Sequence, residues 1–332
     1  MKFSPEKIKK VELHVHLDTC LSFQYMQKIS PGIGLDEFRS TFIAPDRCRD
    51  LGDFISKIAP QIEILQTRKA ITLAVDDLFQ QLAADNVIYA EIRFAPLLHT
   101  VLGLTGEEIV ETVISAMQHC SQLYSIEAGL LLCTLRHFTG QESMYTANLV
   151  LKYQGQGVVG LDLAADEAGS SLENHIEAFE LVSHAGGNVI AHAGEACGAA
   201  SIEETLDKLK VSRIGHGVRC IEDQRVIDRL IREEILLEIC PSCNLVCNVF
   251  NTIEDHPVNL LKERGIRLNI NTDARTVVNT TLNDEYQRLH DTFNWSTADF
   301  IRCNEHAIAA SFIDDASKQR LLKKLTCSSE CQ

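Results

Sequence analysis

The sequence lacks concentrated positive charge. Its formal net charge is −15 at pH 7, and the short segment KIKK at 7–10 is its densest run of basic residues. Binding to a nucleic acid requires a basic patch or stripe that neutralises phosphates. The charge balance therefore argues against a nucleic-acid partner.

Long apolar runs are also absent. No run approaches the roughly 18 residues that cross a membrane. The N-terminal segment MKFSPEKIKK has charges but no apolar stretch of the kind that a signal peptide needs. The twelve cysteines are scattered along the chain, and without an export signal we expect reduced thiols. These features predict a cytoplasmic protein with no membrane partner; they leave the oligomeric state open.

The chain has no low-complexity segment, no sequence repeat and no obvious linker. It also has no G-x-G-x-x-G motif after its first apolar run, which would have supported the rival arrangement of two doubly wound domains. Instead, short and nearly continuous apolar runs alternate with stretches of helical periodicity, as expected for parallel strands buried on both faces. The pattern predicts a TIM-type (β/α)₈ barrel as a single domain over residues 1–332. The runs are 11–17, 87–96, 127–137, 158–166, 188–195, 213–219, 235–243 and 266–274.

The helical periodicity is clearest in IEETLDKLK (202–210) and IEDQRVIDRLIREE (221–234), and the tail after residue 274 has further helical content. The gap between the first two runs is unequal to the others, at about 70 residues. An insertion there follows the C-terminal end of a strand, so we expect helices over the mouth of the barrel. A lid over the substrate is the preferred interpretation, and plain helical decoration is the alternative.

The stretch VELHVHLDTC (11–20) holds two histidines one residue apart. Residues two apart in a strand point to the same face, so His14 and His16 would be directed at one spot. Two imidazoles at one spot suit a metal, although a polar strand face is the simpler alternative.

Other apolar runs end in similar residues. Active sites of (β/α)₈ barrels lie at the C-terminal ends of the strands, so these side chains would share one rim. Imidazole and carboxylate are normal zinc ligands, and a catalytic site leaves a position for water. We assign as ligands of a single zinc ion His14, His16, His192 and Asp273.

Three carboxylate or imidazole groups have predicted catalytic roles. His216 and Asp273 are placed to orient a water molecule or to take its proton. Glu195, three residues past a predicted ligand, could donate a proton to the substrate if an apolar pocket raises its pKa.

The motif set HVHLD, YAEIRFAP, LDLAADE, AHAGE, GHG, CPSCN and NTDART…TTLNDEY resembles that of the adenosine deaminase family of metal-dependent amidohydrolases. The resemblance runs from residue 12 to about 286. It implies a barrel with one zinc and hydrolysis of the 6-amino group of adenosine or 2′-deoxyadenosine, giving inosine and ammonia. By position, Glu195 would protonate the purine N1 and His216 would act on the water, while Asp18 would contact a ribose hydroxyl. The residues expected to contact substrate are His16, Asp18, Ala165, Asp166 and Ala274.

Three positions depart from the family pattern. Ala274 replaces a second carboxylate that bonds the purine N7, Ala165 replaces a glycine whose backbone N–H contacts N3, and Thr19 replaces a glycine. Loss of one polar contact to a buried ring nitrogen would cost about 1–3 kcal/mol. Water or Arg275 could compensate for it.

These departures leave other functions open. The same reaction on another 6-aminopurine, either adenine or an N6-modified adenine nucleoside, is the main alternative. A different hydrolase of the same barrel type and a non-enzymatic barrel are weaker ones. The segment CPSCNLVC (240–247) has no partner C-x-x-C pair, so we do not expect a separate metal site there. The histidines interpreted as structural or solvated include His99, His137 and His256, and Glu91 and Arg93 are interpreted as buried scaffold groups.

Overall fold

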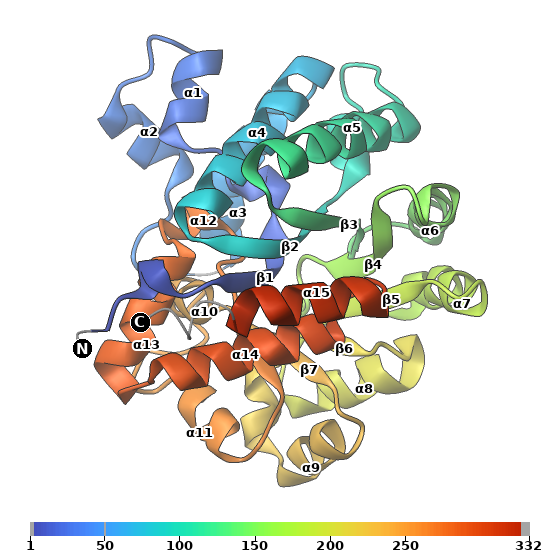
Figure 1. Cartoon of the computed structure of the whole chain (residues 1–332). Coiled ribbons are helices and arrows are strands. Elements are labelled where there is room, and N and C mark those ends of the chain that lie inside the picture. Colours follow the sequence, from blue (N-terminus) through green and yellow to red (C-terminus); the bar gives the residue numbers. More distant parts are fainter. Residues whose placement is uncertain (1–2, 50, 327–332) are drawn as a thin grey trace.

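Eight parallel strands follow one another in chain order around a barrel (Figure 1). The computed structural model describes residues 3–49 and 51–326. Backbone hydrogen bonds from Asp273 to His14 and from His16 to Asp273 join the segment after the last strand to the first. The predicted (β/α)₈ barrel is therefore confirmed. Its strands are β1 (Lys10–His16), β2 (Val87–Phe94), β3 (Glu127–Leu135), β4 (Val158–Ala164), β5 (Asn188–Ala193), β6 (Arg213–His216), β7 (Leu236–Ile239) and β8 (Leu268–Ile270).

Most apolar runs extend past the strands they contain. The run 235–243 is the clearest case, because the strand stops at Ile239 and a helix begins at Pro241. A proline is well suited to the first turn of a helix, where its missing N–H is not needed. Glu195 and Asp273 likewise lie in loops that follow their strands.

Helices follow the strands and cover the outside of the barrel (Figure 1). Reciprocal capping boxes, in which a Ser or Thr side chain and an acidic side chain satisfy backbone N–H groups, begin α5, α6, α13 and α14. These helices are α5 (Gly106–Tyr124), α6 (Gly140–Tyr153), α7 (Ile176–His184), α8 (Ala199–Leu209), α9 (Gln224–Arg232), α10 (Pro241–Val246), α11 (Val258–Glu263), α12 (Arg275–Val278), α13 (Leu282–Phe293), α14 (Thr297–Ala310) and α15 (Asp315–Thr326). Short 3₁₀ turns are η1 (Pro5–Lys7), η2 (Leu17–Thr19), η3 (Pro96–His99), η4 (Glu173–His175) and η5 (Val218–Glu222). Within the described residues, none of the helices is both long and apolar enough to cross a membrane.

The long connection between β1 and β2 is helical, as predicted. Its first two helices project from the side of the barrel (Figure 1), whereas the third contacts η2 and α12 beside the ends of β1 and β8. Phe54, Ile55, Ile58 and Ile62 of that third helix line the cavity at the barrel mouth. The insertion consists of α1 (Phe23–Ile29), α2 (Leu35–Phe42), α3 (Leu51–Ile64) and α4 (Arg68–Ala84). Its movement as a lid stays a prediction.

Buried charges fill the inside of the barrel. The guanidinium of Arg93 is fully buried and lies 2.7 Å from the Asp162 carboxylate and 2.6 Å from that of Glu238. Arg213 lies 3.0 Å from the other oxygen of Glu238 and also pairs with Glu91. We call these five residues the interior charge network. Glu91 and Arg93 are thus buried scaffold groups, as predicted.

The C-terminal helices close the other end of the barrel. The backbone N–H of Phe312 donates to Glu91, and the Arg213 guanidinium lies 3.8 Å from the centre of the Phe312 ring. Arg213 also donates to the carbonyl oxygen of Ala310. The segment between α14 and α15 therefore satisfies charges that would otherwise face an open barrel end.

Substitution of Arg93 by methionine tests this network. Removal of one partner leaves buried carboxylates uncompensated, so we expect Arg93→Met to lower the free energy of unfolding by about 3–5 kcal/mol. Urea unfolding followed by circular dichroism measures the change. The control is Arg232→Met, because Arg232 is largely exposed and, among the described residues, forms an ion pair with its neighbour Glu233, so little change is expected. Equal effects of the two substitutions would contradict the proposed importance of the network.

Candidate active site

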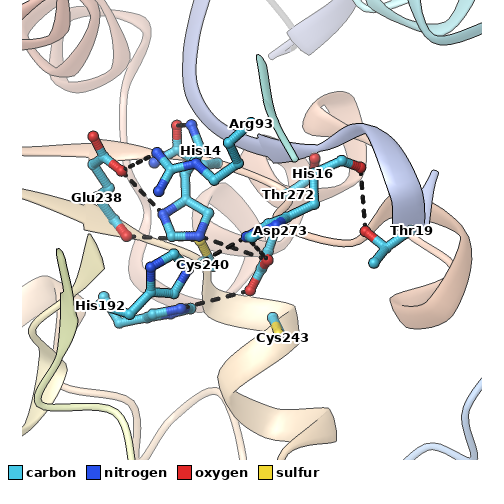
Figure 2. A network of polar contacts seen from close by, with 12 residues as sticks. His14, His16, Thr19, Arg93, His192, Glu238, Cys240, Cys243, Thr272 and Asp273 are labelled. Atoms are coloured by element: carbon cyan, nitrogen blue, oxygen red, sulfur yellow. Dashed lines mark hydrogen bonds and ion pairs between the residues drawn. The ribbon is translucent and has the colours of Figure 1, made fainter. Parts of the chain in front are cut away.

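Imidazole rings from three strands meet one carboxylate at the C-terminal rim of the barrel (Figure 2). The Nε2 atoms of His16 and His192 lie 3.3 Å apart. The Asp273 carboxylate lies 3.4 Å from His16 Nε2 and 3.6 Å from His14 Nε2. The structure therefore brings together the four residues that the sequence assigned to a metal.

The spacing of these atoms fits a metal better than it fits hydrogen bonds. Two nitrogens that each lie 2.0–2.1 Å from a tetrahedral zinc are about 3.3 Å apart, which matches the separation of His16 and His192. The Nε2 atom of His14 is buried and has no hydrogen-bond partner among the described residues. Burial lowers the pKa of His16 to about 4, so its ring is neutral, as a metal ligand must be.

Carboxylates from inside the barrel hold two of these rings. Glu238 accepts from His14 Nδ1 at 3.0 Å, and Asp162 accepts from His192 Nδ1 at 3.2 Å, so both Nε2 atoms face the shared space. Histidines that bind metals usually donate their second nitrogen in this way. Sequence reasoning missed both carboxylates; their place in strands β4 and β7, close to the strand ends, was the available signal.

Two of the site residues have unusual backbone conformations. His216 has φ of 62° and Asp273 has φ of 64°, in the left-handed region that non-glycine residues seldom adopt. Such a conformation costs about 1–3 kcal/mol and is commonly found at functional sites. Here it directs both side chains to one place, because His216 Nε2 lies 3.6 Å from the Asp273 carboxylate.

Glu195 faces the same space from the loop after β5. Its carboxylate lies 3.5 Å from His216 Nε2. Burial, with help from the carboxylates of Asp273 and Glu167, raises the pKa of Glu195 well above its ordinary value. The raised pKa favours the protonated carboxyl group, which can donate its proton.

A second glutamate, missed at the sequence level, fixes this loop. The carboxylate of Glu167 accepts hydrogen bonds from four consecutive backbone N–H groups, 194–197, and from the Ser201 hydroxyl. One carboxylate thus sets the backbone on both sides of Glu195. Its position in the LAADE segment was the only available signal.

The side-chain amide of Asn244 contacts both Glu195 and His216, which have predicted catalytic roles. Asn244 Nδ2 lies 3.2 Å from the Glu195 carboxylate and 3.2 Å from His216 Nδ1. The amide oxygen of Asn244 lies 3.2 Å from Nε2 of His256, which is buried. His256 is thus structural, as predicted, and it supports the site by holding the amide of Asn244.

A cavity of about 340 Å³ opens beside these groups. This volume is within the usual range for small-molecule sites. Apolar side chains from α3, β3 and the loops form much of its wall, and no lysine or arginine of the described chain lines it. All the residues predicted to contact substrate line the cavity, namely His16, Asp18, Ala165, Asp166 and Ala274.

The three departures from the family pattern all lie at this cavity. Ala274 is buried in an apolar cluster with Phe54 and Cys243. Ala165 has φ of 76°, a conformation that explains a glycine preference at this position. The suggestion that Arg275 compensates for Ala274 is wrong, because both ends of its guanidinium pair with the buried carboxylates of Glu12 and Asp85, away from the cavity.

Two histidines interpreted as structural or solvated lie closer to the site than expected. His99 is buried with Nε2 3.5 Å from the Asp18 carboxylate, which also accepts from the Ala95 N–H. His137 lines the cavity on its exposed side. The fixed orientation of Asp18 thus depends on a histidine some 80 residues away in sequence.

Comparison with known proteins extends this description. The profile of the adenosine deaminase family matches residues 9–327. The chain belongs to the adenosine deaminase family. It is 31% identical over 321 residues to an adenosine deaminase of Clostridium perfringens, covering 95% of this chain and 97% of that protein. It is 34% identical over 325 residues to one of Lacticaseibacillus paracasei, covering 96% of each.

Solved structures agree on the architecture. The crystal structure of an adenine deaminase from Arthrobacter aurescens matches with a TM-score of 0.88 and 27% identity, covering 98% of this chain and 100% of that one. An N6-methyl-AMP deaminase from Arabidopsis thaliana shares the fold, with a TM-score of 0.86 and 24% identity over 98% of each chain. The resemblance read from the sequence is confirmed, and the chain is a hydrolase that acts on C–N bonds.

Metal content tests the candidate ligand set. We expect His192→Ala to weaken metal binding by more than about tenfold, because loss even of groups that only orient a ligand costs 10- to 100-fold. Equilibrium dialysis followed by elemental analysis measures this. The control is His137→Ala, which changes a cavity-lining histidine outside the cluster. Unchanged metal binding by His192→Ala would contradict the assignment.

Proposed function

We propose that this chain is a zinc-dependent adenosine deaminase with a single catalytic domain. It hydrolyses adenosine and 2′-deoxyadenosine to inosine or deoxyinosine and ammonia. One observation carries the proposal. The cluster of His14, His16, His192 and Asp273 adjoins the cavity that Glu195 and His216 also line, and the side chains of Glu195 and His216 lie 3.5 Å apart.

His14, His16, His192 and Asp273 would hold the zinc ion. When bound, zinc supplies Lewis acidity that makes water nucleophilic at neutral pH. The fit rests on the orphaned Nε2 of His14 and on the spacing of the other two rings. Neutral imidazoles and one carboxylate are donors that zinc accepts.

Side chains of the protein then transfer two protons, one from Glu195 to the substrate and one from the attacking water. Glu195 donates to a ring nitrogen of the substrate, which withdraws electrons from the adjacent carbon that bears the amino group. His216 and Asp273, whose side chains lie 3.6 Å apart, accept a hydrogen bond from the attacking water and take its proton. The proton passes to the leaving amino group, which departs as ammonia. The apolar wall formed by α3 keeps other water away from these groups.

Several observations favour a nucleoside as substrate. The relatives at 31% and 34% identity carry the name adenosine deaminase. Asp18 lies at the cavity with its carboxylate fixed by His99 and the Ala95 N–H, so it can accept a hydrogen bond from a sugar hydroxyl. A nucleotide is disfavoured, because its phosphate would meet acidic Asp18 and Asp166 and no cation of the described wall.

Adenine is the second candidate substrate. The likeness to the Arthrobacter adenine deaminase supports it, as does the absence of a carboxylate at Ala274. An N6-modified adenine nucleoside remains a third candidate from the sequence. A binding protein without activity is disfavoured, since every group needed for the chemistry is present.

Formation of the 6-oxopurine product by the zinc-loaded protein tests these choices, because N6-methyladenosine would release methylamine and the other substrates ammonia. Adenosine, 2′-deoxyadenosine, adenine, N6-methyladenosine and AMP are compared side by side. We expect kcat/KM for the two unmodified nucleosides to exceed that for the others by more than about tenfold, in line with loss of a buried polar partner. Preferred hydrolysis of adenine or of the N6-methyl nucleoside would overturn the choice of substrate but keep the mechanism.

The substitution Glu195→Gln tests the role of Glu195 as the proton donor. Glutamine cannot donate the proton, so we expect kcat to fall by about 10²–10⁴-fold. The matched control is Glu204→Gln, an exposed carboxylate on α8 that pairs with Lys208. Dialysis and elemental analysis should show that both variants keep their metal. An active Glu195→Gln enzyme would contradict the assigned role.

A further inference from the structure

Two thiols that are not among the proposed zinc ligands lie in the wall of the cavity. Cys243 belongs to α10 and Cys247 follows its last turn, so the two are neighbours on one helical face. Both are free thiols and both line the cavity. Cys243 is drawn beside the Asp273 carboxylate (Figure 2). No step of the proposed reaction uses either thiol.

The separation of the sulfurs is that of two ligands on one ion. The two Sγ atoms lie 3.8 Å apart. Two thiolates each 2.3 Å from a tetrahedral zinc are about 3.8 Å apart. A carboxylate oxygen of Glu195 completes a group of three in which all ligand atoms lie within 4.8 Å of one another.

We propose that Cys243, Cys247 and Glu195 form a second cation site, separate from the histidine site, which binds a thiophilic d¹⁰ cation such as Cd²⁺ or excess Zn²⁺. Soft thiolates select such ions over Mg²⁺ or Ca²⁺. The sequence argued against a metal site in this segment because no second C-x-x-C pair exists. The fold supplies the third ligand instead, from the loop after β5.

Binding at this site has two chemical consequences. Each ligand gives up a proton to solvent when it binds the cation, two from the thiols and one from the acid form of Glu195, so three protons are released per ion bound. Glu195 becomes a ligand and can no longer donate a proton to a substrate. The ion would therefore inhibit the enzyme by binding the carboxylate of Glu195, the proposed general acid. This inhibition rests on the proposed function, whereas the binding of the ion does not.

The experiment uses the full chain loaded with one equivalent of zinc, and Cd²⁺ as the probe. Thiolate-to-cadmium charge transfer gives an ultraviolet absorption band that histidine and carboxylate ligands do not give. A phosphine reductant keeps the thiols reduced. We expect a saturable band, with one further Cd²⁺ bound per chain. We also expect Cys243→Ser and Cys247→Ala to weaken binding by more than about tenfold, since even outer contacts contribute 10- to 100-fold.

Two control variants make the assignment specific. Cys240→Ser removes a buried thiol that lies near His14, His216 and Asp273, so it reports on cadmium entering the histidine site. Cys197→Ser removes another partly exposed thiol. Both should keep the band. A band lost only with Cys240→Ser or Cys197→Ser, or a band unchanged in both cluster variants, would overturn the proposal.

A second measurement separates the site from its effect on catalysis. Inhibition of ammonia release by Cd²⁺ is titrated in each variant relative to its own uninhibited rate. Cys247→Ala is the milder substitution because its side chain is only partly buried, and thermal unfolding confirms that it folds. A shift of the inhibition constant by more than about tenfold, parallel to the loss of the band, is expected. The ultraviolet band without inhibition would support the second cation site and contradict the role of Glu195 as the acid. Inhibition without the band would contradict the second cation site.

Discussion

The buried ion pair between Arg93 and Glu238 is the interaction on which the site depends. Arg93 joins the two carboxylates that hold His14 and His192. Charges inside a barrel are costly unless each one has a partner, so the whole network must be complete before any part is stable. The geometry of the rim therefore follows from electrostatics in the centre of the barrel. A single guanidinium sets the orientation of imidazoles that come from different strands.

The sequence was sufficient to predict the barrel and the convergence of the site. Strands buried on both faces produce apolar runs, and the C-terminal ends of such strands meet at one rim. His14, His192, His216 and Asp273 could thus be grouped from the positions of the strand ends alone, and the fold brings them together. The motif set added the chemistry that strand ends alone could not supply.

The supporting groups could not be predicted, because their roles depend on contacts distant in sequence. Glu167 accepts hydrogen bonds from four backbone N–H groups of a loop nearly thirty residues later in the sequence. No periodicity in the sequence indicates such an arrangement. Arg275 was one of two groups suggested to compensate for Ala274, yet it pairs with the buried carboxylates of Glu12 and Asp85. The run 235–243 was expected to be one strand, although Pro241 begins the helix that carries the cavity thiols.

The segment between α14 and α15, which closes one end of the barrel, imposes an order on folding. Arg213 and Glu91 acquire partners from Ala310 and Phe312, which come after all eight strands in the sequence. A chain emerging from the ribosome can form its early βα units, but these buried charges lack partners until the residues that follow β8 have also emerged. Until then, water must remain among the charges. A late step of folding is thus expected to be a drying step, in which the segment between α14 and α15 excludes solvent from a barrel whose wall is already assembled.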